Sequence, residues 1–148
     1  MSRITAKEVR PELAFVRECV QLGRKWRSMV DERLRNRGLT LARGTVLYWL
    51  AEASGPMPQS RLAEIIGIEG PTLVRLLHAL EAQGLVERVP FEGDRRAKGL
   101  RLTAAAAPYL DLIDTVADEL CDQYLDRLDK RRLSSATKLV REARTSIS

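Results

Sequence analysis

The spacing of apolar residues changes from helical to strand-like at Gly84. In residues 71–83, leucines recur every three or four positions, which predicts a helix with one apolar face. Residues 85–89 and 99–102 are short strand-like runs on either side of a polar, glycine-containing turn at residues 92–96, which predicts a hairpin. A helix that leads directly into a two-stranded hairpin places the chain in the mixed α+β class, mostly α.

Two shorter helices are predicted immediately before this pair of elements. Residues 41–53 carry apolar side chains at helical spacing and end at a cluster of serine, glycine and proline. Residues 61–66 form a short helix, and a tight turn at residues 67–70 separates it from the helix that starts at Pro71, where the missing N–H costs nothing. Short helix, glycine-containing turn, second helix and hairpin is the order of a winged helix-turn-helix.

Long helices are predicted at both ends of the chain. Residues 8–37 carry two apolar stripes and stop at Asn36-Arg37-Gly38. The first stripe consists of Leu13, Val16, Val20, Val30 and Leu34, and the second of Phe15, Cys19, Leu22, Trp26 and Met29. A helix with two apolar stripes must be covered from two directions, so we expect it to meet a second chain or a separate lobe.

The C-terminal part is predicted to contain two further helices. The first runs from Thr103, as its N-cap, to about residue 128, and Pro108 should kink or loosen its first turns. The second covers residues 133–144 and has only one thin apolar face. This composition suits a helix that packs against a partner.

Composition limits the classes of function. The chain has 148 residues, enough for one domain, and its formal net charge of +5 favours polyanionic partners such as nucleic acid. No apolar run approaches the roughly 18 residues of a membrane span, and no signal peptide is recognisable, so the expected location is the cytoplasm. With a single histidine, His78, and no CxxC spacing, we expect no metal, no cofactor and no enzyme.

The second helix of a winged helix-turn-helix enters the DNA major groove, which is about 12 Å wide, and its early residues reach base edges. Here these residues are Thr72 and Arg75, and a bidentate arginine fork on guanine makes Arg75 the predicted base reader. The cations of the hairpin tip are predicted to reach the minor groove, with Asp94 orienting one of the arginines. They are Arg95, Arg96 and Lys98. The alternative interpretation of all these positions is a solvated surface.

The residues of the two predicted DNA-contacting elements also carry a family resemblance. Residues 65–75 and 80–86 closely resemble the recognition region of MarR-family transcriptional regulators, and the SlyA-like branch above all. Asp94-Arg95-Arg96-Ala97-Lys98 and Leu102-Thr103 are similar to the wing signature of that family. The resemblance extends over about residues 13–110 and is more specific than either element alone.

The resemblance implies an architecture and a partner. It implies one MarR-type domain over residues 1–148, with a DNA-binding lobe at about residues 41–103. The helices of residues 8–37 and 104–148 would interlock with those of a second copy to form a triangular homodimer. The DNA target would be a short A·T-rich inverted repeat, because a two-fold symmetric protein requires a symmetric site.

Family members often respond to small aromatic carboxylates, and the resemblance implies a matching pocket here. The residues at the matching positions are Arg24, Arg27 and Tyr48, and arginine is well suited to hold a carboxylate. The alternative for Arg27 is an ordinary salt bridge with Asp31. Gly44 stands where SlyA relatives carry a pocket tryptophan, which argues against a salicylate-type ligand and predicts a larger pocket.

Two rival functions remain open at this point. Some relatives sense oxidants through a cysteine of the first helix, and Cys19 and Cys121 lie in roughly the relevant regions; the register of Cys19 disagrees, so buried structural thiols are favoured. Winged helices also serve as protein-interaction modules. The presence of both Arg75 and the Arg95-Arg96 tip argues against that role, since such a module needs neither.

Overall fold

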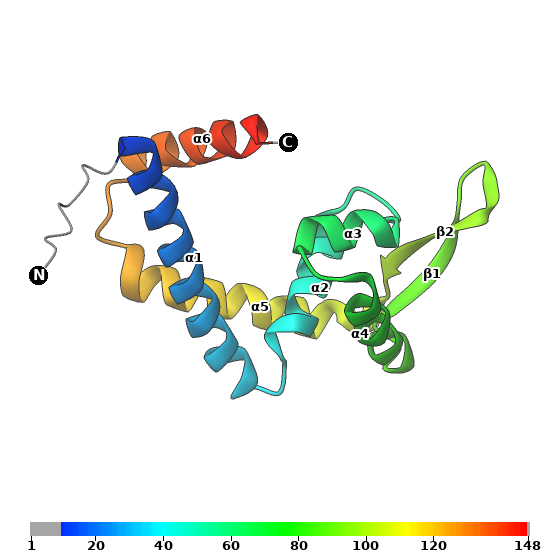
Figure 1. Ribbon diagram of the computed structural model, residues 1–148. Helices are drawn as coiled ribbons and strands as arrows, with labels where there is room; N and C mark the ends of the chain where they lie inside the picture. The colour runs from blue at the N-terminus through cyan, green and yellow to red at the C-terminus, as the bar shows by residue number, and fades with distance from the viewer. Residues whose placement is uncertain (1–9, 148) are drawn as a thin grey trace, which may run out of the picture. The chain divides into compact units, whose positions relative to one another are not determined.

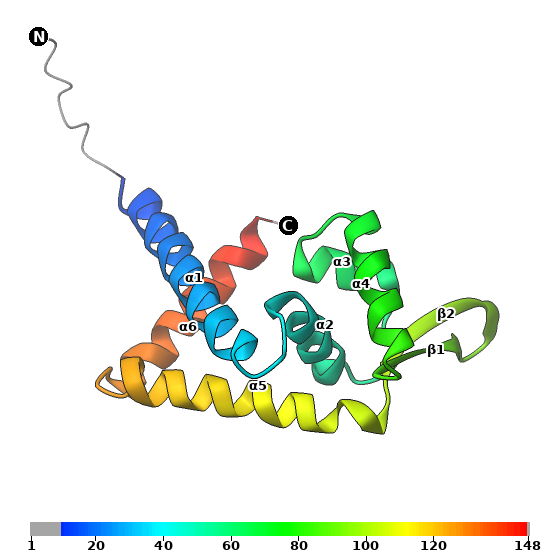
Figure 2. The same cartoon turned by 90° about the horizontal axis from the view of Figure 1, so that it is seen from below.

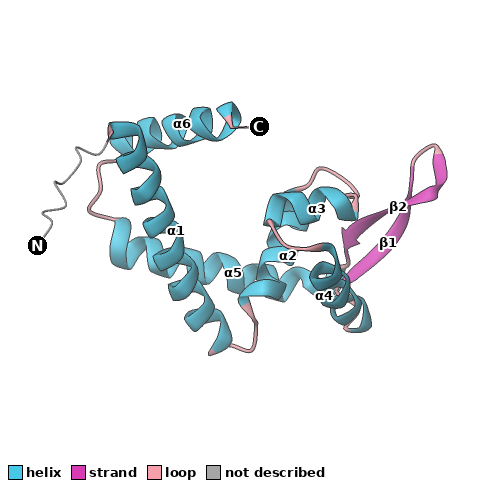
Figure 3. Ribbon diagram, viewed as in Figure 1, coloured by secondary structure: helices cyan, strands magenta, loops and turns pink. Residues whose placement is uncertain are grey.

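The computed structural model describes residues 10–147, apart from the side chains of residues 94 and 95. The chain divides into two compact units, residues 1–116 and 117–148, which are described separately. The helices of the first unit are α1 (Pro11–Arg35), α2 (Leu41–Glu52), α3 (Gln59–Ile66), α4 (Gly70–Ala82) and most of α5 (Ala107–Leu120). Its strands, β1 (Val86–Phe91) and β2 (Asp94–Leu102), form one antiparallel hairpin (Figures 1 and 3). The predicted class, α+β and mostly helical, is confirmed.

The core of the first unit lies among α2, α3, α4 and the base of the hairpin. Its fully buried side chains include Val46 and Leu47 of α2, Leu62 of α3, Leu73, Leu77 and Leu80 of α4, and Leu100 of β2. The hairpin extends away from these helices in both views (Figures 1 and 2). One core therefore fixes α4 and the base of the hairpin in a single lobe, while the tip of the hairpin reaches into solvent.

The predicted turn between the two short helices is confirmed at Gly67. This residue has φ of +71°, and its N–H donates to the Ala63 carbonyl at 2.8 Å. A side chain would strain this left-handed conformation, so glycine gives α3 a sharp end and lets the chain turn into α4. Helix α3 begins at Gln59, two residues earlier than predicted. The prediction missed these two residues because they are polar and show no apolar spacing.

A short bridge to β2 was not predicted. The N–H of Met57 donates to the Leu100 carbonyl at 2.9 Å, and the N–H of Leu100 donates to the Met57 carbonyl at 2.8 Å. The loop between α2 and α3 can approach so closely because residue 99 is glycine. A Cβ at Gly99 would lie 2.5 Å from the Pro56 Cβ and 3.0 Å from the Phe91 Cζ.

We therefore expect Gly99→Ala to lower the free energy of unfolding by about 1 kcal/mol, because the added methyl overfills the contact with the loop. Denaturant unfolding followed by circular dichroism measures this difference. Gly55→Ala is the matched control, since a Cβ at Gly55 would have no atom within 4 Å. Equal stability of the two variants would contradict the close approach at Gly99.

The predicted helix over residues 103–128 is interrupted at both ends. Thr103 is not a side-chain cap; its hydroxyl donates to the Gly84 carbonyl at 2.5 Å and ties the helix start to the end of α4. A 3₁₀ turn (Ala104–Ala106) precedes α5, which matches the loosening expected near Pro108. After α5 the chain forms a π-helix over Cys121–Leu125, which apolar spacing alone does not distinguish from an α-helix.

The second unit contains the end of α5, the π-helix and α6 (Lys130–Ser146). Asp129 caps α6 by accepting the N–H of Arg132 at 2.8 Å, so the helix starts three residues before the predicted residue 133. Among the described residues of this unit, only Leu120 is buried. None of the helices in residues 10–147 has the length and apolar character of a membrane span.

Candidate nucleic-acid interface

Helix α4 separates an inward leucine face from an outward polar face. Leu73, Leu77 and Leu80 are fully buried, which confirms three of the four leucines predicted to face inward. The fourth, Leu76, is only half-buried. Three buried side chains at helical spacing fix both the position and the rotation of α4 about its own axis.

The fixed rotation of α4 determines where the predicted base readers lie. Thr72 and Arg75 are both exposed and three residues apart, so they are neighbours on the outward face near the start of α4. His78, one turn further on, is also exposed. This end of a helix, with a hydroxyl and a guanidinium side by side, can place one hydrogen-bonding face against base edges.

Two of the three cations predicted to reach the minor groove have described side chains on the hairpin, which we call the wing. Its register pairs Val86 with Leu102 and is shifted by an irregularity between Pro90 and Phe91. Arg96 and Lys98 are exposed on β2; Lys98 pairs with Pro90, and Arg96 lies in the irregular segment before it. The side chains of Asp94 and Arg95 lie outside the described residues, so their predicted roles stay predictions.

An arginine on the inner side of the wing joins three elements of the lobe. The Arg88 Nε donates to Glu81 Oε1 at 2.8 Å, and its Nη1 donates to Gln59 Oε1 at 3.0 Å. Gln59 begins α3, Glu81 is in the last turn of α4, and Arg88 is in the middle of β1. This group was not predicted, because Gln59 and Arg88 are 29 positions apart in the sequence.

A pocket of about 580 Å³ lies between α1 and the helix-turn-helix, within the first unit. Its polar lining consists of Arg27, Asp31, Arg35, Thr40 and Thr45, and its apolar lining of Leu41, Ala42, Ile66, Ile68 and Leu76. Of the three residues predicted for a ligand pocket, Arg27 lines this one. Arg24 and Tyr48 do not, and the rings of Tyr48 and Trp49 instead form a T-shaped contact with their centroids 5.3 Å apart.

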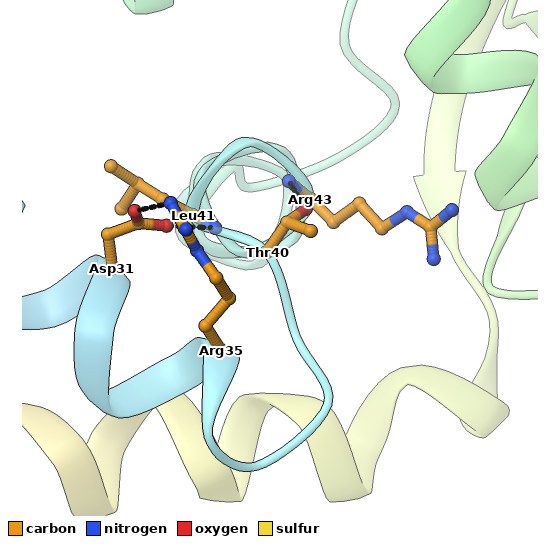
Figure 4. Close-up of polar contacts among 5 residues, drawn as sticks. All are labelled: Asp31, Arg35, Thr40, Leu41 and Arg43. Carbon is orange, nitrogen blue, oxygen red and sulfur yellow. Dashed lines mark hydrogen bonds and ion pairs between the residues drawn. The ribbon is translucent and has the colours of Figure 1, made fainter.

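Asp31 connects the two helices that border this pocket (Figure 4). One carboxylate oxygen accepts the N–H of Leu41 at 3.4 Å, in the first turn of α2, and the other pairs with Arg35. Asp31 thus forms its ion pair with Arg35, not the pair with Arg27 considered from the sequence. Thr40 caps α2 by accepting the N–H of Arg43, whose guanidinium points away from the pair.

Gly44 does not enlarge a cavity as the sequence predicted. It is buried, and a Cβ there would lie 3.2 Å from Leu34 Cδ1 and 3.5 Å from Leu39 Cδ2. The space left by the missing side chain is therefore filled by leucines of the end of α1 and the following loop. This close packing, instead of an open pocket, is the consequence of glycine at this position.

The cysteines are not the buried structural thiols that the sequence favoured. Both are free, Cys19 half-buried on α1 and Cys121 exposed at the start of the π-helix. Among the described residues, no three histidine, cysteine or acidic side chains are grouped so as to hold a metal ion. The polar groups that the structure brings together are those of α4, the wing and the pocket.

The fold and these exposed side chains define a winged helix-turn-helix protein of the DNA-binding type. A family model for the MarR family matches residues 37–97. The chain is also similar to the transcriptional regulator PA3341, with 35% identity over 90% of this chain and 97% of that chain and a TM-score of 0.82. The chain belongs to the MarR family of transcription regulators.

Two more distant structures share the fold. A mutant of S. aureus MepR bound to an oligodeoxyribonucleotide is 21% identical, over 95% of this chain and 100% of that chain, with a TM-score of 0.57. CouR from Rhodococcus jostii RHA1 bound to p-coumaroyl-CoA is 23% identical, over 86% and 87% of the two chains, with a TM-score of 0.71. At these identities the likeness shows the fold alone.

Proposed function

We propose that this protein is a SlyA-like, sequence-specific transcription regulator that binds an A·T-rich inverted repeat through α4 and the wing. The observation that carries the proposal is the outward face of α4, where Thr72 and Arg75 are exposed while the leucines behind them are buried. Arg96 and Lys98 add exposed cations on the wing of the same lobe. DNA-bound MepR, which shares the fold, supports this assignment.

The DNA-binding form is a homodimer in this proposal, because several large apolar side chains of the described residues are exposed. Within the 25 residues of α1, only Leu34 is buried, and Leu13, Val16 and Val20 are 54%, 45% and 47% exposed along one stripe. In the second unit, Tyr124, Leu128 and Leu139 are about half exposed. A helix gains most of its stability by packing its apolar face, so these surfaces fit a second copy of the chain.

Selection of preferred duplexes from a random library, at about 150 mM salt, tests the DNA-binding proposal. Enrichment of an A·T-rich palindrome, followed by a clear affinity gap between that duplex and scrambled DNA, is the expected result. Binding without enrichment and with steep salt dependence would leave only non-specific attraction to phosphate and would overturn the proposal.

We also propose that a small aromatic or carboxylate effector binds in the pocket between α1 and the helix-turn-helix. Arg27 and Arg35, the latter paired with Asp31, line it together with five apolar residues, a combination suited to an aromatic acid. CouR bound to p-coumaroyl-CoA shows that this fold accommodates an aromatic thioester, which favours a ligand-responsive regulator over one that senses oxidants through Cys19.

Arg27→Ala should raise the concentration of p-coumarate, the free acid of the CouR ligand, needed for half-maximal release of DNA by about tenfold, because one charged hydrogen bond to the carboxylate is lost. Fluorescence anisotropy of labelled DNA measures the release. Arg24→Ala is the matched control, since Arg24 is exposed on the same helix but does not line the pocket. Release that is equally affected by both substitutions, or by neither, would contradict this ligand site.

A further inference from the structure

Arg88 is a charged residue on the inner side of the wing. It pairs across the hairpin with Leu100, and Val86, two residues earlier on the same strand, is buried, as is Leu100. Side chains two positions apart, and directly paired side chains, share one face of a hairpin. An arginine at this position would be costly unless its guanidinium had fixed partners, since burial removes water from a charge.

The guanidinium has partners on two other elements. The side chains of Arg88 and Glu81 are 29% and 26% exposed, so their ion pair is shielded from much of the solvent. Gln59, itself half-buried, accepts the second hydrogen bond. A charge-assisted hydrogen bond in such surroundings is stronger than one on the open surface. The wing strand is thereby tied both to the first turn of α3 and to the last turn of α4.

We infer that Arg88 is a positioning residue for DNA binding, which holds the wing and the recognition helix α4 at the separation and angle that a duplex requires. The inference rests on the proposed DNA-binding function and adds a residue that does not touch DNA. Two elements that enter neighbouring grooves bind DNA more tightly when both are already in place, because fixing a mobile element on binding lowers affinity. The Arg88–Glu81–Gln59 group fixes the wing against α4 before DNA binds.

Arg88→Met keeps the length of the side chain and removes both contacts. We expect it to weaken binding of the selected duplex about fivefold, without a change in the slope of log K against log[salt]. If Arg88 instead contacted a phosphate, the slope would become shallower by about 0.9. That result would overturn the positioning role.

Glu81→Met removes the acceptor of the Arg88 hydrogen bond together with its charge, and it is expected to weaken DNA binding, although loss of an acidic group alone would strengthen it. Removal of an acidic group from a DNA-binding lobe normally strengthens DNA binding through charge alone. If Glu81 acts by holding Arg88, the variant binds more weakly in spite of this gain. Glu87→Met is the matched control: Glu87 is next to Arg88 on β1, and its partner Arg101 lies directly across the hairpin, but both are more exposed. It should bind DNA at least as tightly as the unchanged protein.

A double-mutant cycle of Arg88→Met with Lys98→Ala distinguishes a positioning role from a loss of stability. Lys98→Ala removes a wing cation, and its cost in DNA affinity should be smaller in the Arg88→Met protein, because a wing that is not held contributes less. Thermal unfolding confirms that each variant is folded at the assay temperature. Equal costs of Lys98→Ala in both backgrounds, or stronger binding by Glu81→Met, would overturn the inference. Failure of the unchanged protein to select a duplex would instead overturn the proposed function.

Discussion

Val16→Glu combined with Val20→Glu should yield a monomer that binds the inverted repeat at least on the order of a hundredfold more weakly. The two valines lie on the exposed apolar stripe of α1, and an uncompensated carboxylate buried in a dimer interface is strongly unfavourable. A monomer engages a single half-site and loses the gain of simultaneous binding, which is typically about 10² to 10⁴. Analytical ultracentrifugation gives the oligomeric state, and anisotropy gives the affinity.

The double variant Gln21→Glu with Ser28→Glu is the charge-matched control. Both positions are exposed on α1, and neither lies on the apolar stripe. The core of the DNA-binding lobe is formed by α2, α3, α4 and the wing, so circular dichroism should show a folded protein for both pairs. A dimer that survives Val16→Glu and Val20→Glu would show that this stripe is not the interface.

The helix-turn-helix was predictable because its determinants are close together in the sequence. Gly67 ends one helix, Pro71 lies in the first turn of the next, and the leucines of α4 follow a helical period within a few residues of both. Local spacing and local backbone chemistry therefore determine which side of α4 faces outward. The exposure of Thr72 and Arg75 follows from the burial of Leu73 and Leu77.

Contacts between distant segments were not predictable in this way. The bridge of Met57 to Leu100 depends on hydrogen bonds of the main chain, which carry no residue-type signal, and Gly99 is only a permissive position. The Arg88–Glu81 pair is separated by seven residues and by a change of secondary structure. The sequence shows that Arg88 is a charged residue among the apolar residues of a strand, but it does not show with which residue Arg88 forms an ion pair.

The lining of the pocket depends on how each helix is turned. Arg27, Asp31 and Arg35 follow i,i+4 spacing and so lie along one face of α1, toward α2. Arg24 precedes them by about one turn and does not reach the lining, while Tyr48 is further along α2 than the lining residues Leu41 and Thr45. The family resemblance selects positions on α1 and α2, and the rotation and extent of each helix decide which of them border this pocket.

Arg75→Ala should weaken binding of the preferred duplex by roughly 1 to 3 kcal/mol and relax the preference at one base position of each half-site. Arg75 is exposed near the start of α4, where a recognition helix meets base edges, and alanine removes the bidentate fork. The measurement is a repeated duplex selection with the variant, followed by titration against each single-base substitution of the original site.

Arg75→Lys is the informative comparison, because lysine retains the charge but cannot form the same planar fork. We expect it to lose the base preference while keeping the salt dependence of the unchanged protein, whereas Lys98→Ala should weaken all sequences alike and reduce the salt slope by about one. If both Arg75 variants select the original sequence with its full preference, Arg75 is a surface cation, and base reading must be sought at Thr72 or at His78, the exposed residues next to it on α4.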